Sequence, residues 1–172
     1  MPTYTAALVA AVFLDTGVLS QATQRRGKST EGDACRVWVQ GLLAAKVVVF
    51  VPEICDYELR REFLRQSNTN GIARLDAFVT SGIARYLSVN TSSLREAARL
   101  WAEVRKAGKP TAPDNALDGD CIVCGQVNEW CNRSGIALAD VVVATTNVSD
   151  LARFSDQAGN SLQCAEWRDI TL

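Results

Sequence analysis

Short apolar runs rich in Val, Ile and Leu alternate along the chain with amphipathic stretches of helix length. A parallel sheet with helices on its faces has this pattern, because its strands are buried on both sides and helices connect them. The spacing therefore predicts an α/β fold, a three-layer α/β/α domain whose central, mostly parallel sheet has about five strands. We expect the strands near residues 8–14, 47–51, 85–89, 141–145 and 165–170.

The segments between the predicted strands carry helix start and stop signals. Pro52 suits the first turn of a helix, Thr91 or Ser92 can cap another, and Asp118 can cap a third. Two segments show no regular apolar pattern. We expect an exposed, mobile connection at 21–33 and a loop at 108–117. The predicted helices span about 37–44, 52–65, 72–79, 92–107 and 119–133, with a short one before the last strand.

Size and composition limit the functions that the chain can have. With 172 residues, 48% apolar and 22% charged, the chain fits one domain, which we expect to span residues 1–172. It contains no His, which excludes His general bases, Ser-His-Asp and Cys-His nucleophile systems, and His-ligated zinc or haem. The formal net charge is -1, so any contact with nucleic acid has to be a local patch.

Six cysteines are too few for a disulfide scaffold at this length, so a reduced, cytoplasmic setting is expected. The apolar run at 6–14 has no basic residue before it and ends next to an acid, unlike a signal peptide. No apolar stretch reaches the roughly 20 residues that span a bilayer, so we expect no membrane contact. Cys121 and Cys124 have the local spacing of a zinc site, but together with Cys131 they also form one stripe of a helix, and a buried role is favoured.

Acidic residues stand at or near the ends of several predicted elements. In an open parallel sheet, ligands bind beyond the carboxyl ends of the strands. Asp15 ends the first strand, Glu58 lies in the helix after the second, and Asp150 follows the fourth. Asp118 and Asp120 open the helix that follows the predicted loop. The pattern predicts that acids from four elements gather along one edge of the sheet.

Gathered carboxylates repel one another unless a cation joins them. Mg²⁺ or Mn²⁺ is the expected cofactor, because these hard ions prefer oxygen ligands and bind through a few carboxylates together with substrate phosphates. Such a site needs no His, and a bound metal ion supplies hydroxide and stabilises the attacking and leaving oxygens. Metal-assisted hydrolysis of phosphodiester bonds is the predicted chemistry.

Four stretches of the sequence together resemble a known family. They read Phe-Leu-Asp-Thr-Gly-Val-Leu at 13–19, Val-Pro-Glu-Ile-Cys-Asp-Tyr-Glu-Leu-Arg-Arg at 51–61, Leu-Asp-Gly-Asp-Cys-Ile-Val at 117–123 and Val-Ala-Thr-Thr-Asn at 143–147. In this order and spacing, over nearly the whole chain, they are similar to the PIN-domain ribonucleases, in particular the VapC-like toxins of bacterial toxin–antitoxin pairs. The resemblance implies a PIN-like fold with a four-acid, Mg²⁺- or Mn²⁺-dependent site that cuts RNA, leaving a 5′ phosphate and a 3′ hydroxyl.

The family's acids, carried over by position, fall on Asp15, Glu58, Asp120 and Asp150, and Asp118 is a further candidate metal ligand. We expect three polar residues, Thr16, Thr145 and Asn147, to orient carboxylates, metal-bound waters or the scissile phosphate. Arg61 is expected to contact RNA phosphates.

Several of these residues also have simpler interpretations. Asp118 and Asp150 can each cap a helix, Glu58 can pair with the neighbouring Arg61, and Asp156 is an alternative fourth acid. Position 17 departs from the family, where many members have Asn or Ser, because Gly17 offers no side chain beside Asp15.

The resemblance also implies partners: an RNA substrate, a small antitoxin protein that inserts among the acids, and a second copy of the chain in a homodimer. Apolar residues at 42–45 and 75–79 would suit either the dimer or the core. Three rival functions stay open. They are a phosphatase of the haloacid-dehalogenase type, with Asp15 as nucleophile but no acid at position 17, a structure-selective DNA nuclease, and a PIN-like binding module without turnover.

Overall fold

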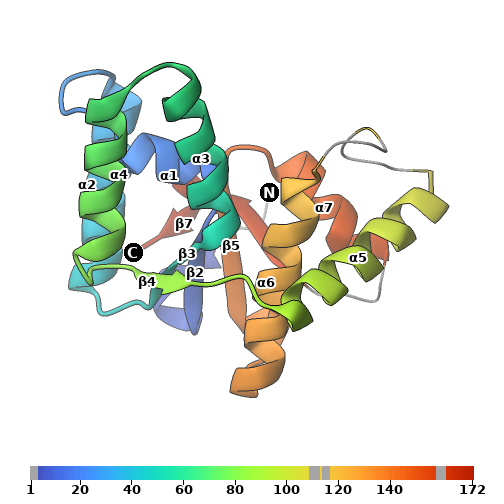
Figure 1. The fold of residues 1–172 in the computed structure, drawn as a ribbon. Helices are drawn as coiled ribbons and strands as arrows, with labels where there is room; N and C mark the ends of the chain where they lie inside the picture. The colour runs from blue at the N-terminus through green and yellow to red at the C-terminus, as the bar shows by residue number, and fades with distance from the viewer. Residues whose placement is uncertain (1–3, 109–112, 114–116, 158–161) are drawn as a thin grey trace.

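Five parallel strands form the central sheet of the computed structural model, which describes residues 4–108, 113, 117–157 and 162–172 (Figure 1). Their order across the sheet is β4-β3-β2-β5-β6, and every neighbouring pair is parallel. The predicted α/β class with a sheet of about five strands is confirmed. The strands are β2 (Ala11–Leu14), β3 (Val49–Pro52), β4 (Arg85–Leu87), β5 (Val141–Thr145) and β6 (Gln163–Glu166).

The apolar runs form strands because both faces of the sheet are covered. Every residue of β2, β3 and β5 is buried, and β2 lies between the other two, with Phe13 beside Phe50 and Val143. On one side the rings of Phe13 and Phe50 stack 5.0 Å apart and Trp130 packs against both. Continuous burial of this kind explains why the strands lack an alternating polar pattern.

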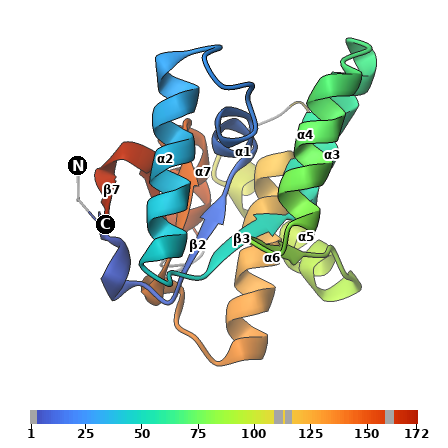
Figure 2. The same ribbon diagram turned by 90° about the vertical axis from the view of Figure 1, so that its left-hand side faces the viewer.

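Helices lie on both sides of the sheet, as the two views show with α2 and α6 on opposite sides of β2 and β3 (Figures 1 and 2). The two longest, α5 and α6, pack against each other. Among the described residues, none of these helices is long and apolar enough to cross a membrane. They are α1 (Thr16–Ala22), α2 (Thr30–Ala44), α3 (Glu53–Arg65), α4 (Thr69–Thr80), α5 (Thr91–Lys106), α6 (Gly119–Ser134) and α7 (Val148–Gln157).

The strand order reverses at β2. From β2 the chain moves outward to β3 and β4, then returns to β5 on the other side of β2 and continues to β6. Loops that leave the carboxyl ends of β2 and β5 therefore diverge, which opens a place for a ligand in folds of this kind. Asp15 and Asn147 follow these two ends directly or within two residues.

Several predicted boundaries are wrong. The first strand starts at Ala11 because residues 6–8 form a short 3₁₀ helix, and α1 begins at Thr16, where no helix was predicted. Asn90, rather than Thr91 or Ser92, caps α5, since its side chain accepts a hydrogen bond from Ser93. The predicted last strand is divided into β6, a 3₁₀ turn and β7 (Ile170–Thr171), and β7 pairs with β1 (Tyr4–Thr5) in a separate two-stranded sheet.

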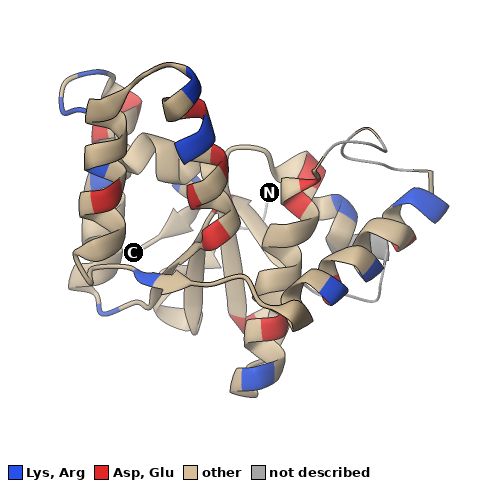
Figure 3. Ribbon diagram, viewed as in Figure 1, with Lys and Arg blue, Asp and Glu red and all other residues tan. Residues whose placement is uncertain are grey.

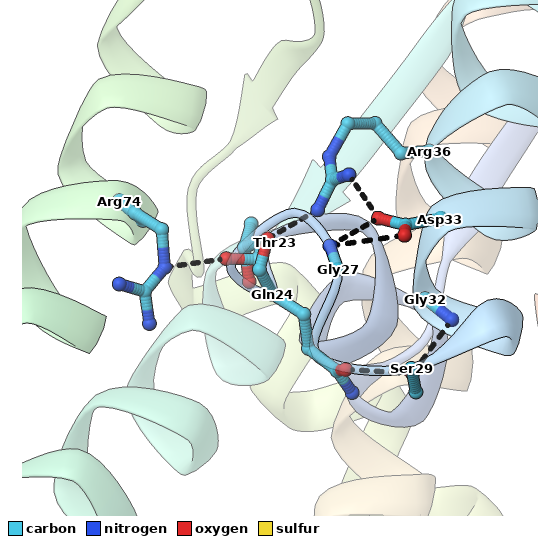
Figure 4. Close-up of polar contacts among 8 residues, drawn as sticks. All are labelled: Thr23, Gln24, Gly27, Ser29, Gly32, Asp33, Arg36 and Arg74. Carbon is cyan, nitrogen blue, oxygen red and sulfur yellow. Dashed lines mark hydrogen bonds and ion pairs between the residues drawn. The ribbon is translucent and has the colours of Figure 1, made fainter.

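The connection from α1 to α2 is exposed from residue 25 to residue 31, as predicted, but hydrogen bonds fix its backbone at both ends (Figure 4). Arg74 of α4 donates to the Thr23 carbonyl at 3.0 Å, and Arg36 donates to the Gln24 carbonyl. Asp33 accepts from the Gly27 amide at 3.0 Å and from Arg36 at 2.7 Å. Because α1 already runs to residue 22, this segment is also shorter than predicted. The predicted loop at 108–117 lies mostly outside the described residues.

Candidate active site

Asp15 connects β2 to α1. It is the N-cap of α1, and its side chain accepts a hydrogen bond of 2.7 Å from the Thr16 amide. A second bond of 2.7 Å comes from the Thr145 hydroxyl at the end of β5. Only 8% of Asp15 is exposed. Burial raises the pKa of this carboxyl, the two hydrogen bonds oppose that rise, and the charge of Glu58 adds to it.

Thr145 fixes the orientation of Asp15 from the neighbouring strand. It is fully buried, and its hydroxyl both donates to Asp15 and accepts a bond of 2.9 Å from the Asn147 amide. This chain of hydrogen bonds ties the carboxyl end of β5 to the carboxyl end of β2. Thr145 therefore contacts Asp15, a carboxylate that it was predicted to orient.

Glu58 reaches the same region from α3. The Thr16 hydroxyl donates to its Oε2 at 2.7 Å, and an Nη of Arg61 lies 3.7 Å from its Oε1. Arg61 also lies over the Tyr57 ring, 5.6 Å from the ring centre. Glu58 thus makes both contacts that the sequence suggested, one with the Thr16 hydroxyl and one with Arg61, its partner in the simpler interpretation as an ion pair.

An ion-pair network around the buried Asp56 holds α3, and with it Glu58, in place. Asp56 is 7% exposed and accepts hydrogen bonds from Arg60 at 3.1 Å and from the Tyr86 hydroxyl at 2.9 Å. Arg60 also donates to Asp76 of α4 at 2.7 Å. These contacts join α3 to β4 and α4, and nothing in the sequence pattern had singled them out.

Asp118 and Asp120 stand at the start of α6. Asp118 is the N-cap, with its side chain accepting from the Cys121 amide at 3.3 Å, so the capping interpretation is confirmed. Asp120 lies in the first turn, and its pKa is raised to about 7. Burial is the largest cause, followed by the charges of Asp15, Asp118, Asp150 and Glu58.

Asp150 lies in the first turn of α7, three residues after Asn147. The Asn147 side-chain amide donates to it, and Arg153 forms an ion pair with it at 3.0 Å. Its charge nevertheless reaches Asp120. The side chain of Asp156, the alternative fourth acid, lies outside the described residues.

Acids from four elements therefore lie near Asp120, and Figure 3 shows those of α3 and of the start of α6 in red on neighbouring helices. We call Asp15, Glu58, Asp118, Asp120 and Asp150 the acidic cluster. Within the described part of the chain, no three His, Cys, Asp or Glu side chains are close enough to enclose a metal ion. The donor chemistry of the cluster nevertheless fits Mg²⁺ or Mn²⁺, because it consists of carboxylate oxygens whose mutual repulsion a divalent cation relieves.

Two glycines beside these acids make close approaches that the sequence reading missed. A Cβ atom at Gly17 would collide with the Thr146 hydroxyl, so that hydroxyl occupies the space where a side chain at position 17 would begin. A Cβ atom at Gly119 would collide with the Glu58 carboxylate. The only signal in the sequence was the position of each glycine within two residues of an acid.

The three cysteines of the predicted helix belong to the core, and the two segments considered for a dimer belong to it in part. Cys121, Cys124 and Cys131 are free and buried along α6, which agrees with their helical spacing. Leu42 and Leu75, from the segments considered for a dimer, are fully buried, whereas Ala44 and Ala45 are exposed.

The fold is shared with solved structures of low sequence identity. A chain of the VapBC-1 structure from nontypeable Haemophilus influenzae matches with a TM-score of 0.62 and 15% identity over 92% of this chain and 98% of that one. The chain has a PIN-like fold. The DNA-bound VapBC from Salmonella typhimurium matches with a TM-score of 0.62 and 16% identity, over 91% of this chain and 98% of that one.

A chain of a third structure also matches, that of VapBC2 from Rickettsia felis bound to a DNA fragment from the VapBC2 promoter. Its TM-score is 0.60, with 11% identity over 91% of this chain and 98% of that one. No protein-family model and no curated protein matches the sequence. At these identities the likeness establishes the fold, and the function has to be argued from the residues.

Proposed function

We propose that the protein is a metal-dependent endoribonuclease, the toxin of a toxin–antitoxin pair. The observation that carries the proposal is the grouping of acids around Asp120 at the carboxyl edge of the sheet, where burial, together with Asp15, Asp118, Asp150 and Glu58, raises the pKa of its carboxyl. A structural protein has no need to collect charges that destabilise it, whereas perturbed acids are common at catalytic sites. The VapBC matches support the same proposal.

Asp15, Glu58, Asp120 and Asp150 would hold Mg²⁺ or Mn²⁺, with Asp118 contributing charge while it caps α6. When bound, the ion supplies a hydroxide near neutral pH and stabilises the oxygens that attack and leave. Thr145 and Thr16 keep the Asp15 and Glu58 oxygens in fixed directions.

Two other polar residues, Arg61 and Asn147, would contact the RNA backbone and hold Asp150, respectively. Arg61 is about half exposed beside Glu58, so its guanidinium can contact a phosphate of the RNA backbone. Asn147 restrains Asp150 through its side-chain amide.

Two surfaces support the proposed protein partners. A groove of about 300 Å³ between α2 and α4 is lined mainly by apolar atoms, including Leu43 and Phe78, and has Arg36 and Arg74 on its wall. It suits a further antitoxin segment with apolar and acidic residues, in addition to the segment expected to insert among the acids. Beside the acidic cluster, three apolar side chains are about half exposed: Tyr57, Leu94 and Leu117. An exposed apolar surface of this kind suits contact with a second copy of the chain.

The test is cleavage of a panel of labelled RNAs and matched DNAs with Mg²⁺, with Mn²⁺ and with EDTA. We expect metal-dependent cuts in RNA that leave 5′ phosphates and that disappear in Asp15→Asn and in Asp120→Asn. Asp140→Asn is the matched control, because Asp140 is an exposed acid just before β5, at the opposite end of that strand. Cuts in DNA alone, or cuts that survive both substitutions, would refute the proposal, and Mn²⁺ binding without any cleavage would favour a binding module.

A further inference from the structure

Gly119 is buried between Asp118 and Asp120, at the first helical position of α6. A Cβ atom built on it would lie 2.7 Å from Cδ of Glu58 and nearer still to Oε1, and its three nearest atoms all belong to that carboxylate. The Glu58 carboxylate therefore occupies the volume where any other residue would begin its side chain. We propose that Gly119 is a positioning residue, whose missing side chain lets the Glu58 carboxylate lie against the first turn of α6.

The backbone does not require glycine at this position. Gly119 lies within a regular helix and does not have a left-handed conformation, so Ala fits its backbone and is the better helix former. The atoms that a Cβ would meet are the far end of a flexible side chain, which can rotate away. The fold can accept a side chain at 119, but the Glu58 carboxylate then has to move.

The contacts of Glu58 show what such a move would change. One side of its carboxylate is held by the Thr16 hydroxyl at 2.7 Å, and the other rests against Gly119. This position places Glu58 next to Asp118 and Asp120, across the boundary between α3 and α6. The role of Gly119 at a metal site rests on the proposed function, whereas its effect on the position of Glu58 does not.

The experiment measures Mn²⁺ affinity by titration calorimetry on the full chain. Gly119→Ala is expected to keep or raise the melting temperature while weakening Mn²⁺ binding by about tenfold or more. Gly41→Ala is the matched control. Gly41 is also helical but lies in α2, and a Cβ atom there would also meet a flexible side chain, that of Leu172. The control should leave Mn²⁺ affinity unchanged.

Combined variants separate positioning from a general structural effect. If Gly119 acts through Glu58, adding Gly119→Ala to Glu58→Ala should cause no further loss of Mn²⁺ affinity. The double variant Glu58→Asp, Gly119→Ala should bind Mn²⁺ more tightly than Gly119→Ala alone, because the shorter Asp side chain leaves room for the new Cβ atom. Equal affinities of the wild type and Gly119→Ala, or a loss that persists without Glu58, would overturn the proposal.

A direct readout distinguishes this proposal from the proposed function. If the wild type neither binds Mn²⁺ nor cuts RNA, the proposed function fails, and crystal structures of the wild type and Gly119→Ala then test the positioning alone. We expect the Glu58 carboxylate to be displaced in the variant. A carboxylate in the same place would refute the positioning role.

Discussion

Asp120→Asn should stabilise the metal-free protein at neutral and alkaline pH. The wild-type carboxyl keeps its proton up to about pH 7 in the folded state, whereas it releases it near its usual pKa of 3.8 in the unfolded chain. Between these values the folded state binds more protons than the unfolded state, so the free energy of unfolding falls as the pH rises through this interval. Asn has a similar shape and carries no charge, so it removes this dependence.

The size of the effect follows from the two pKa values. Each tenfold change in a dissociation constant is worth about 1.4 kcal/mol, so the difference between 3.8 and about 7 corresponds to about 4 kcal/mol in total. Roughly 2 to 3 kcal/mol of this is expected between pH 5 and pH 8. The advantage of Asp120→Asn over the wild type should grow by that amount across this range.

The assay is urea unfolding of both proteins in EDTA at several pH values from 5 to 8, with Asp140→Asn as the control that should follow the wild type. At pH 8, excess Mn²⁺ should raise the melting temperature of the wild type but not that of Asp120→Asn. A stability difference between wild type and variant that is constant with pH would contradict this prediction, because it would mean that neither burial nor the other acids raise the pKa of Asp120.

Two further substitutions test the hydrogen bonds and contacts around Asp15. Thr145→Val keeps the shape of a buried residue but removes the hydroxyl that serves Asp15 and Asn147, so urea unfolding should show a loss of about 1 to 3 kcal/mol that Thr145→Ser largely avoids. Gly17→Ser should destabilise the protein by about 1 kcal/mol or more, because the new side chain meets the Thr146 hydroxyl. Adding Thr146→Ala should relieve most of that loss, and no relief would show that the contact is not its cause.

The strands of the sheet could be predicted because their burial is visible in the sequence. Ala11–Leu14 and Val141–Thr145 are apolar at nearly every position, and such runs suit strands covered on both faces. Helix α1 was missed because Thr16 and Gly17 begin it, and neither is a strong helix former. It is stabilised by packing against α2 and α3 and by the Asp15 cap, which are tertiary and capping effects rather than propensity.

The candidate acids could be predicted because they stand at the ends of elements that are themselves visible in the sequence. Asp15 directly ends a buried strand, Asp120 follows a helix cap, and parallel strands bring their carboxyl ends to one edge. The assignment of these acids and their neighbours as metal ligands stays a prediction, as does the single-domain boundary at 1–172. What the sequence pattern supported was a set of candidate acids and the edge of the sheet where they meet.

The α/β class, the central strands and the order of the acids could be deduced from the amino-acid sequence alone, because burial and element ends are local properties of the chain. Three contacts could be seen only in the folded chain: Thr145 holds Asp15, Asp56 anchors the helix of Glu58, and Gly119 makes room for the Glu58 carboxylate. These contacts join residues 30 to 130 positions apart. Hydrogen bonds and collisions act over a few ångströms, and only folding brings such distant residues within that range.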